Sequence, residues 1–289
     1  MTAAALRNYV ELAKPRITTL VVFTCASGLW LAPGRLSART VILTLVGTVL
    51  IVAAANVLNM YLERDTDALM KRTMNRPLPA GRMDPQQALR FGLALAAISV
   101  PLLTFAVGPL PGLLASVALV SYVLLYTPLK RHTTAALLVG AVPGAIPPLI
   151  GWTAATERLD LPGVLLFAVM FLWQVPHFLA ITLFRREEYA RAGLVVQSNQ
   201  PGGELEARRN IVRYTVALVS VSLLFVPLGI GRGFYFATAL LSGAIFLGYG
   251  IKGLRADAGE RWARIEFLLS LAYLTVLFAV LMLDHGART

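Results

Sequence analysis

Charged residues are scarce in this chain, and cysteine and histidine are nearly absent. Asp, Glu, Lys and Arg make up 14% of the 289 residues, whereas an ordinary soluble domain carries about 25%. The single cysteine, Cys25, excludes a disulfide framework and a cysteine-rich metal site. Hydrophobic residues account for 57% of the chain. This composition excludes an ordinary soluble domain and points to a membrane protein.

The apolar residues collect in repeated runs of roughly twenty, the helix length that crosses a hydrocarbon layer about 30 Å thick. We expect such segments near 17–33, 39–62, 86–107, 110–127, 135–155, 161–184, 211–230, 233–250 and 265–284. The sequence therefore predicts an all-α fold, a polytopic membrane bundle of about nine transmembrane helices. We expect residues 1–289 to form a single integral-membrane domain. The first span is read as a retained helix, because no small-residue cleavage site follows it.

The net charge of +11 could indicate nucleic-acid binding, but the positions of the charges favour topology. Nineteen Lys and Arg residues lie at the N-terminus and in the second, fourth, sixth and eighth loops. The other side of the membrane holds five, namely Arg35, Arg39, Arg158, Arg232 and Arg288. This bias predicts a multi-pass protein of the cell inner membrane with a cytoplasmic N-terminus and an external C-terminus. We expect anionic membrane lipid and a phosphate-rich substrate as partners, and no nucleic acid.

The strongest local motif is a set of oxygen-bearing side chains at the end of the second apolar segment. Asn59, Glu63 and Asp67 are spaced four residues apart, so they follow one face of a helix. Two carboxylates and an amide oxygen that face the same way suit Mg²⁺ held jointly with substrate phosphates. These residues are therefore candidate catalytic residues and metal ligands.

A basic stretch follows these acids directly. It includes Lys71, Arg72 and Arg76, and arginine binds phosphate through two parallel hydrogen bonds. The simpler interpretation is a solvated loop whose arginines only set the membrane topology. Acids, an amide and arginines within one short stretch favour a diphosphate site instead.

These residues together resemble the signature of the UbiA superfamily of intramembrane prenyltransferases. The signature is an Asn, an acid four residues on, an Asp four further, then Arg-Thr and Arg, with a Gly that closes the loop. The matching positions are Asn59, Glu63, Asp67, Met70, Arg72, Thr73, Arg76 and Gly81. Glu63 takes a place often held by Asp. The resemblance implies a nine-helix membrane fold, a prenyl diphosphate donor and Mg²⁺ as cofactor.

Further stretches are similar to the branch of this superfamily that farnesylates protoheme (heme B). They are Lys14-Pro15-Arg16, Tyr126-Thr127-Pro128-Leu129-Lys130-Arg131, the run from Gly144 to Trp152, and Trp173-Gln174-Val175-Pro176-His177-Phe178. The resemblance implies farnesyl diphosphate as donor, heme B as acceptor and heme O as product. It adds Lys130, Arg131 and Arg185 to the diphosphate site. A downstream heme-processing enzyme or a terminal oxidase assembly would receive the product.

Other superfamily members carry a second pair of aspartates, four residues apart, after the sixth span. This chain has no such pair, and Glu187 and Glu188 stand near the place of its latter half. Glu188 is therefore the candidate ligand for a second metal ion.

His177 is the only histidine inside a predicted span, and an ionisable group within the membrane is a candidate functional residue. As a neutral imidazole it could ligate heme iron or handle a proton. The structural alternative is a hydrogen-bonded contact between helices. Trp173 lies one turn away on the same face and could flank a flat macrocycle, although an aromatic residue there is more often core packing. Both residues are candidates for heme binding.

Two other functions remain open. A prenyltransferase that acts on a quinone precursor, a naphthoate or a chlorin would keep the acidic motif and would not need His177. A transporter or channel would place ionisable groups along a pathway near the middle of the membrane. Apart from His177, the predicted helix interiors lack charge and the acids collect at one membrane face, which disfavours transport.

Overall fold

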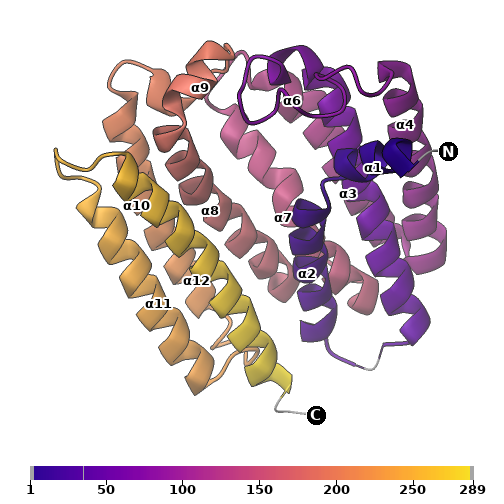
Figure 1. Ribbon diagram of the computed structural model, residues 1–289. Helices are drawn as coiled ribbons and strands as arrows, with labels where there is room; N and C mark the ends of the chain where they lie inside the picture. Colours follow the sequence, from indigo (N-terminus) through magenta and orange to yellow (C-terminus); the bar gives the residue numbers. More distant parts are fainter. Residues whose placement is uncertain (1–2, 35, 287–289) are drawn as a thin grey trace. The chain divides into compact units, whose positions relative to one another are not determined.

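The computed structural model describes residues 3–34 and 36–286, which form helices joined by loops, with no strand among them (Figure 1). In chain order the helices are α1 (Ala3–Leu12), α2 (Pro15–Leu31), α3 (Ala38–Asp67), α4 (Pro85–Pro101), η1 (Leu102–Val107), α5 (Pro109–Val120), η2 (Ser121–Tyr126), α6 (Thr127–Leu129), α7 (Ala136–Thr156), α8 (Leu161–Phe184), α9 (Arg186–Arg191), η3 (Gln197–Asn199), α10 (Gly203–Leu223), α11 (Gly233–Lys252) and α12 (Glu260–Gly286). Arg35 and Arg288 of the charge count lie outside the described residues. The all-α membrane fold is confirmed.

Each predicted span overlaps a helix, and seven helical rods in the described part of the chain are long and apolar enough to cross a membrane. Helix α2 has 17 residues and is shorter than these rods. Helix α10 begins at Gly203, eight positions before the predicted start at 211, because Glu204 and Glu206 with their arginine partners form helical turns. The number nine therefore stays a prediction.

The chain divides into two compact units. Unit 1 comprises the described residues up to 159 together with 188–194, and unit 2 comprises 160–187 together with the described residues from 195 onward. The expectation that the chain acts as a single domain stays a prediction.

In unit 1, helices α2 and α7 approach closely at two glycines. A Cβ atom added to Gly28 would lie 2.0 Å from the carbonyl oxygen of Pro148, and one added to Gly151 would lie 2.0 Å from that of Cys25. Side chains at these positions would separate the two backbones. Small residues are the usual means of such close packing between membrane helices. The paired glycines thus fix α2 against the proline-containing helix α7.

The loop after α3 is anchored on unit 1 rather than left in solvent. Leu78 and Met83 pack with Leu12 and Met60 in a buried cluster. At its surface, the Arg82 guanidinium donates hydrogen bonds to both carboxylate oxygens of Glu11, at 3.0 Å each. This packing fixes the basic loop next to the acidic end of α3.

Unit 2 contains a bundle of four long helices. Helix α8 packs against α10 and α12, and α11 packs against the same two helices. Tyr235 and Tyr273 are buried in the bundle and meet at Ser222. The phenol of Tyr235 donates to the Ser222 carbonyl at 2.8 Å, and that of Tyr273 to the Ser222 hydroxyl at 3.0 Å. Hydrogen bonds from these two phenol groups thus connect α11 and α12 to α10 at the centre of unit 2.

Candidate functional site

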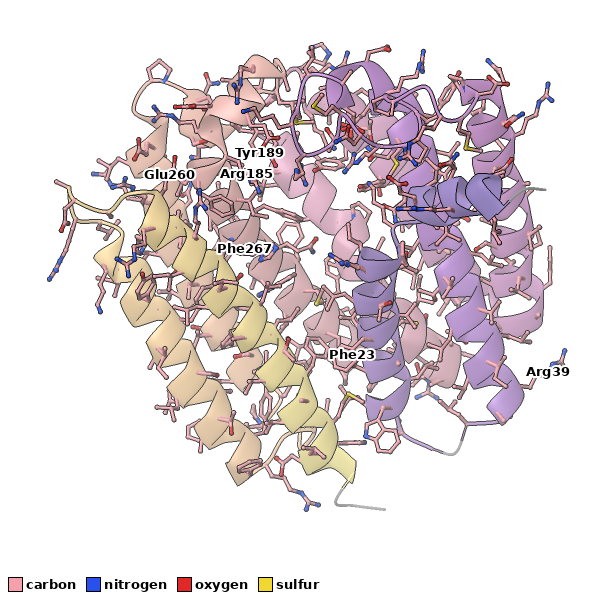
Figure 2. All side chains as sticks on the ribbon, in the orientation of Figure 1. Phe23, Arg39, Arg185, Tyr189, Glu260 and Phe267 are labelled. Carbon is pink, nitrogen blue, oxygen red and sulfur yellow. The ribbon has the colours of Figure 1, made fainter. Side chains whose placement is uncertain are left out.

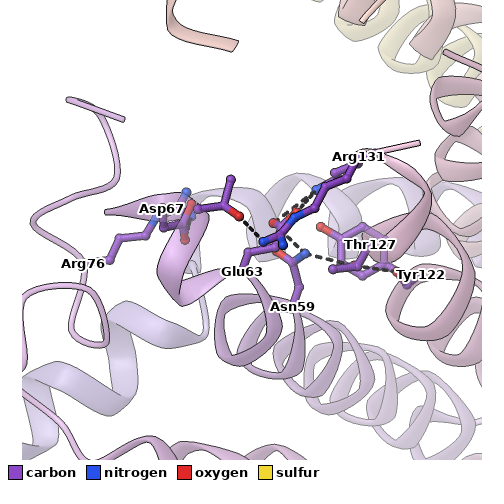
Figure 3. Close-up of polar contacts among 9 residues, drawn as sticks. Asn59, Glu63, Asp67, Arg76, Tyr122, Thr127 and Arg131 are labelled. Carbon is purple, nitrogen blue, oxygen red and sulfur yellow. Dashed lines mark hydrogen bonds and ion pairs between the residues drawn. The ribbon is translucent and has the colours of Figure 1, made fainter. Parts of the chain in front are cut away.

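Helix α3 continues through Asp67, so Asn59, Glu63 and Asp67 lie on one helix as predicted. The helix has 30 residues, and Arg39 lies near its other end (Figure 2). The Asn59 amide donates to Glu63 Oε2 at 2.8 Å (Figure 3). The last turns of α3 therefore carry a connected polar face.

Each acid of this face meets a cation from another part of unit 1. Lys130 Nζ lies 2.9 Å and 3.2 Å from the two carboxylate oxygens of Glu63. Arg76 donates to Asp67 Oδ2 at 2.6 Å, and the Asp67 side chain is only 2% exposed. Because a buried charge is costly without a partner, these cations stabilise the acids. Lys130 and Arg76 thus lie where the sequence predicted a diphosphate site.

A change of helix type brings a hydroxyl group to Asn59. Segment η2 is a wider π-helix that precedes Pro128, whose ring would otherwise clash with a carbonyl one turn back. Thr127 Oγ1 donates to the carbonyl of Tyr122 at 2.8 Å and accepts a hydrogen bond from the Asn59 amide at 3.0 Å. These bonds hold the Asn59 side chain in place (Figure 3). Thr127 is not among the site residues predicted from the sequence.

The other predicted diphosphate residues lie at different places. Arg131 donates to Thr66 Oγ1 on the same end of α3. The side chain of Arg72 is exposed, and its backbone N–H donates to Glu188 Oε1 at 3.2 Å. Arg185 belongs to unit 2, where its guanidinium lies 5.7 Å from the ring centre of Phe184. Arg76, Lys130 and Arg131 therefore meet the end of α3 within unit 1.

Lys14 is a residue of this site that the sequence analysis did not select. It precedes α2 in the left-handed backbone conformation, at φ 48°, which is uncommon for a residue with a Cβ atom. Loss of solvent and the nearby charges of Arg76 and Lys130 lower the pKa of Lys14 to about 7. The unusual backbone at Lys14 could not be read from the sequence. Three basic side chains, Lys14, Arg76 and Lys130, thus lie near the two acids Glu63 and Asp67 in unit 1.

The residues on this face fit a magnesium ion. The set offers two carboxylates and an amide as hard oxygen ligands, and Mg²⁺ usually takes one or two carboxylates with the remaining positions filled by water and phosphate. In the described part of the chain, no group of three His, Cys, Asp or Glu residues could hold a metal. The fit therefore depends on Asn59 and on oxygens from a substrate. Lys130 and Arg76 occupy the carboxylates in the structure.

In unit 2, Trp173 and His177 lie together on α8 as predicted. Their ring centres are 4.6 Å apart and the rings are nearly parallel. The indole N–H of Trp173 donates to the carbonyl of Ser270 at 2.6 Å, and His177 Nδ1 lies 2.8 Å from the Ser270 hydroxyl. The ring centre of Phe267, a residue of α12, lies 4.7 Å from that of His177. Both aromatic side chains of α8 are therefore held by α12.

Sequence comparison places this arrangement in a known family. The family model for "UbiA prenyltransferase family" matches residues 21–272. A protein of Sorangium cellulosum named protoheme IX farnesyltransferase is 53% identical over 279 residues, covering 91% of this chain and 99% of its own. One of the same name from Myxococcus xanthus is 52% identical, covering 97% of this chain and 95% of its own.

Solved structures show the same fold. A structure described as digeranylgeranylglyceryl phosphate synthase matches with a TM-score of 0.84 at 16% identity and covers 97% of this chain and 98% of that chain. A UbiA homolog from Archaeoglobus fulgidus, bound to GPP and Mg²⁺, matches with a TM-score of 0.64 at 14% identity, over 95% of this chain and 99% of that one. The chain belongs to the UbiA prenyltransferase family.

Proposed function

We propose that this chain transfers the farnesyl group of farnesyl diphosphate to a vinyl group of protoheme IX (heme B), which gives hydroxyethylfarnesyl heme (heme O) in the membrane. The observation that carries the proposal is the identity of 50–53% to four proteins named protoheme IX farnesyltransferase. The polar end of α3 supports the proposal, because acids that could hold a metal ion and cations that could neutralise a diphosphate lie together there.

The diphosphate half of the reaction belongs to unit 1. We assign Asn59, Glu63 and Asp67 as the ligands of Mg²⁺, which when bound supplies positive charge to the departing diphosphate. The Archaeoglobus fulgidus homolog, with its bound GPP and Mg²⁺, supports the use of Mg²⁺ with a prenyl diphosphate. Glu188, which accepts a hydrogen bond from the backbone of the Arg72 loop, is the candidate ligand of a second ion.

Lys130 and Arg76 neutralise the phosphate oxygens as the allylic C–O bond breaks. Both cations are already placed beside the acids, so little rearrangement is needed to meet the developing charge. Arg131, Arg72 and Arg185 are proposed to add charge around the leaving group. Apolar helices shield the allylic cation from early capture by water.

The heme half belongs to unit 2, through His177 and Trp173. The electron-rich vinyl group attacks the allylic cation and forms the new carbon–carbon bond. The resulting cation lies next to the porphyrin, which stabilises it. A water molecule then adds to this carbon and loses one proton. Because the proposed residues are divided between the units, we infer that activity needs the whole chain as one domain.

We propose that the acidic end of α3 faces the cytoplasm in the inner membrane, with the C-terminus outside. The excess of Lys and Arg on that side supports this orientation. The native Cys25 is buried, so a membrane-impermeant maleimide can report on introduced cysteines. Lys71→Cys should be labelled only when the cytoplasmic face is open, and Arg158→Cys from outside in intact cells. The reverse pattern would invert the topology.

Product analysis tests the reaction. Membranes that contain the protein are incubated with protoheme, Mg²⁺ and prenyl diphosphates of several lengths, and the extracted porphyrins are analysed by mass spectrometry. We expect a porphyrin that has gained one farnesyl group and one hydroxyl group, and none after chelation of Mg²⁺. Transfer to an aromatic acid with no modified porphyrin would indicate a quinone-precursor enzyme. Flux into vesicles without any prenylated product would indicate a transporter.

A further inference from the structure

The His177 side chain is enclosed on three sides within unit 2. One face of the imidazole stacks on Trp173, and Phe267 packs against the ring with the centres 4.7 Å apart. The Nδ1 edge meets the hydroxyl of Ser270 at 2.8 Å. The ring of Phe178 lies edge-on to the imidazole, with the centres 5.4 Å apart, and the residue is 8% exposed. Nε2 is not among the fully buried side-chain atoms that lack a hydrogen bond, so part of the exposed surface belongs to Nε2.

The Ser270 hydroxyl determines which nitrogen of His177 carries the proton. Ser270 Oγ donates to the carbonyl of Phe267, one turn back, at 2.6 Å. A hydroxyl has one proton to donate, so Oγ must accept at its contact with His177. The donor is then the Nδ1–H group. In the neutral imidazole the proton is consequently on Nδ1, and Nε2 keeps its lone pair.

Within the described residues, no side chain or backbone group makes a hydrogen bond to His177 Nε2. The lone pair on Nε2 therefore has no hydrogen-bond donor among the described residues. A neutral imidazole nitrogen of this kind is a common axial ligand of heme iron. The second nitrogen of such a ligand is usually held by a hydrogen bond that fixes the tautomer and the ring orientation.

We propose that Ser270 is a positioning residue that holds His177 with Nε2 available to ligate the iron of the heme substrate. This inference rests on the proposed function, because it takes heme as the acceptor. Ser270 acts twice: its hydroxyl fixes the imidazole, and its carbonyl accepts the indole N–H of Trp173 at 2.6 Å. Neither role can be read from the sequence, because Ser270 lies 93 positions after His177.

Titration of the full-length purified protein in detergent with ferric heme tests the proposal, with the absorption spectrum reporting the iron ligand. We expect His177→Ala to lose the spectrum of a nitrogen-ligated iron and His177→Gly to regain it with added imidazole. Ser270→Ala should weaken heme binding about 10-fold to 100-fold, the usual effect of removing such a partner. Ser270→Thr, which keeps the hydroxyl, should restore most of the affinity.

Thr275→Ala is the matched control. Thr275 lies on the same helix and is exposed, and among the described residues its hydroxyl bonds only to the carbonyl of Leu271. Its removal should therefore leave heme binding unchanged. An unchanged affinity and spectrum in Ser270→Ala, or in His177→Ala, would overturn the proposal while heme remained the acceptor. A wild-type protein that binds no heme would overturn the acceptor in the proposed function as well. The two failures are thus distinguished by the wild-type titration.

Discussion

The two units bury acidic side chains in opposite ways. In unit 1, Asp67 is 2% exposed and meets Arg76 at 2.6 Å. In unit 2, Glu266 on α12 is fully buried, and neither of its carboxylate oxygens has a hydrogen-bond partner among the described residues. Buried charges normally persist only when they are paired. The buried acid of unit 1 is therefore neutralised by a cation, whereas the buried acid of unit 2 has no such partner among the described residues.

The largest expected effect is the loss of activity when the paired acid of unit 1, Asp67, is neutralised. Asp67→Asn removes the charge that holds Arg76 and that we assign to Mg²⁺. We expect kcat for prenyl transfer to fall by about 100-fold to 1,000-fold, the scale of losing one preorganised electrostatic group. The measurement is the rate of product formation by purified protein. Thermal unfolding should show that the variant still folds.

Asp65→Asn is the control for this change. Asp65 lies two residues away, its side chain is 83% exposed, and its Oδ1 lies 3.9 Å from Nε of Arg64. Its removal should change kcat by about twofold at most, as for most surface substitutions. Equal losses in both variants would show that general charge, rather than the buried acid, controls the rate.

The second prediction concerns the crowding of cations in unit 1. The folded protein holds the pKa of Lys14 at about 7, against 10.5 ordinarily, through loss of solvent and the charges of Arg76 and Lys130. Between these pH values the unfolded chain binds one proton more at Lys14, so this residue makes stability rise as pH increases from 7 to 10.5. We expect the melting temperature of Lys14→Met to rise less over this window than that of the wild type.

Lys71→Met provides the comparison, because Lys71 is an exposed lysine of the same unit. Its pH profile should follow that of the wild type. A Lys14→Met profile that also coincides with the wild type would mean that Lys14 keeps its proton in the folded protein. Loss of solvent and the charges of Arg76 and Lys130 would then be too weak to remove the proton of Lys14 near neutral pH.

The periodicity of the sequence was sufficient to predict the helices and the acidic face, because both depend on local spacing. Asn59, Glu63 and Asp67 share a helix face through their four-residue intervals alone. The partners of these acids could not be derived in the same way, because Lys130 follows Glu63 by 67 positions. Helix ends were also missed where charge pairs extend a helix, as in the first turns of α10. The sequence predicts the elements better than the contacts between them.

The third prediction is that replacing Glu266, the buried acid of unit 2, raises the stability of the protein. Glu266→Leu replaces a carboxyl group that has no hydrogen-bond partner in the described part of the chain with an apolar side chain of similar size. Because an unsatisfied buried polar group costs about 1–3 kcal/mol, we expect this change to raise the melting temperature. Asp67→Leu, which leaves Arg76 without its acid, should lower it. A loss of stability in Glu266→Leu that Glu266→Gln does not share would reveal a hydrogen-bond partner and remove the contrast between the units.

The smallest expected effect comes from the glycine beside this carboxyl group. A Cβ atom on Gly250 would lie 3.2 Å from Glu266 Oε1, whereas one on Gly248 would meet nothing within 4 Å. Replacing a helical glycine by alanine stabilises a helix by up to about 1 kcal/mol. Gly248→Ala should show most of this gain in thermal unfolding. Gly250→Ala should show less, because the carboxyl group must move.

The same two substitutions in a Glu266→Ala background separate this contact from other differences between the glycines. Once the carboxyl group is gone, the next neighbour of a Cβ atom on Gly250 is Ile211, at an ordinary contact distance of 3.7 Å. We therefore expect Gly250→Ala and Gly248→Ala to become equal in stability there. If Gly250→Ala stays less stable than Gly248→Ala, the backbone of α11 rather than the carboxyl group of Glu266 requires glycine at this position. The contact between a Cβ atom at position 250 and Glu266 would then not explain the difference.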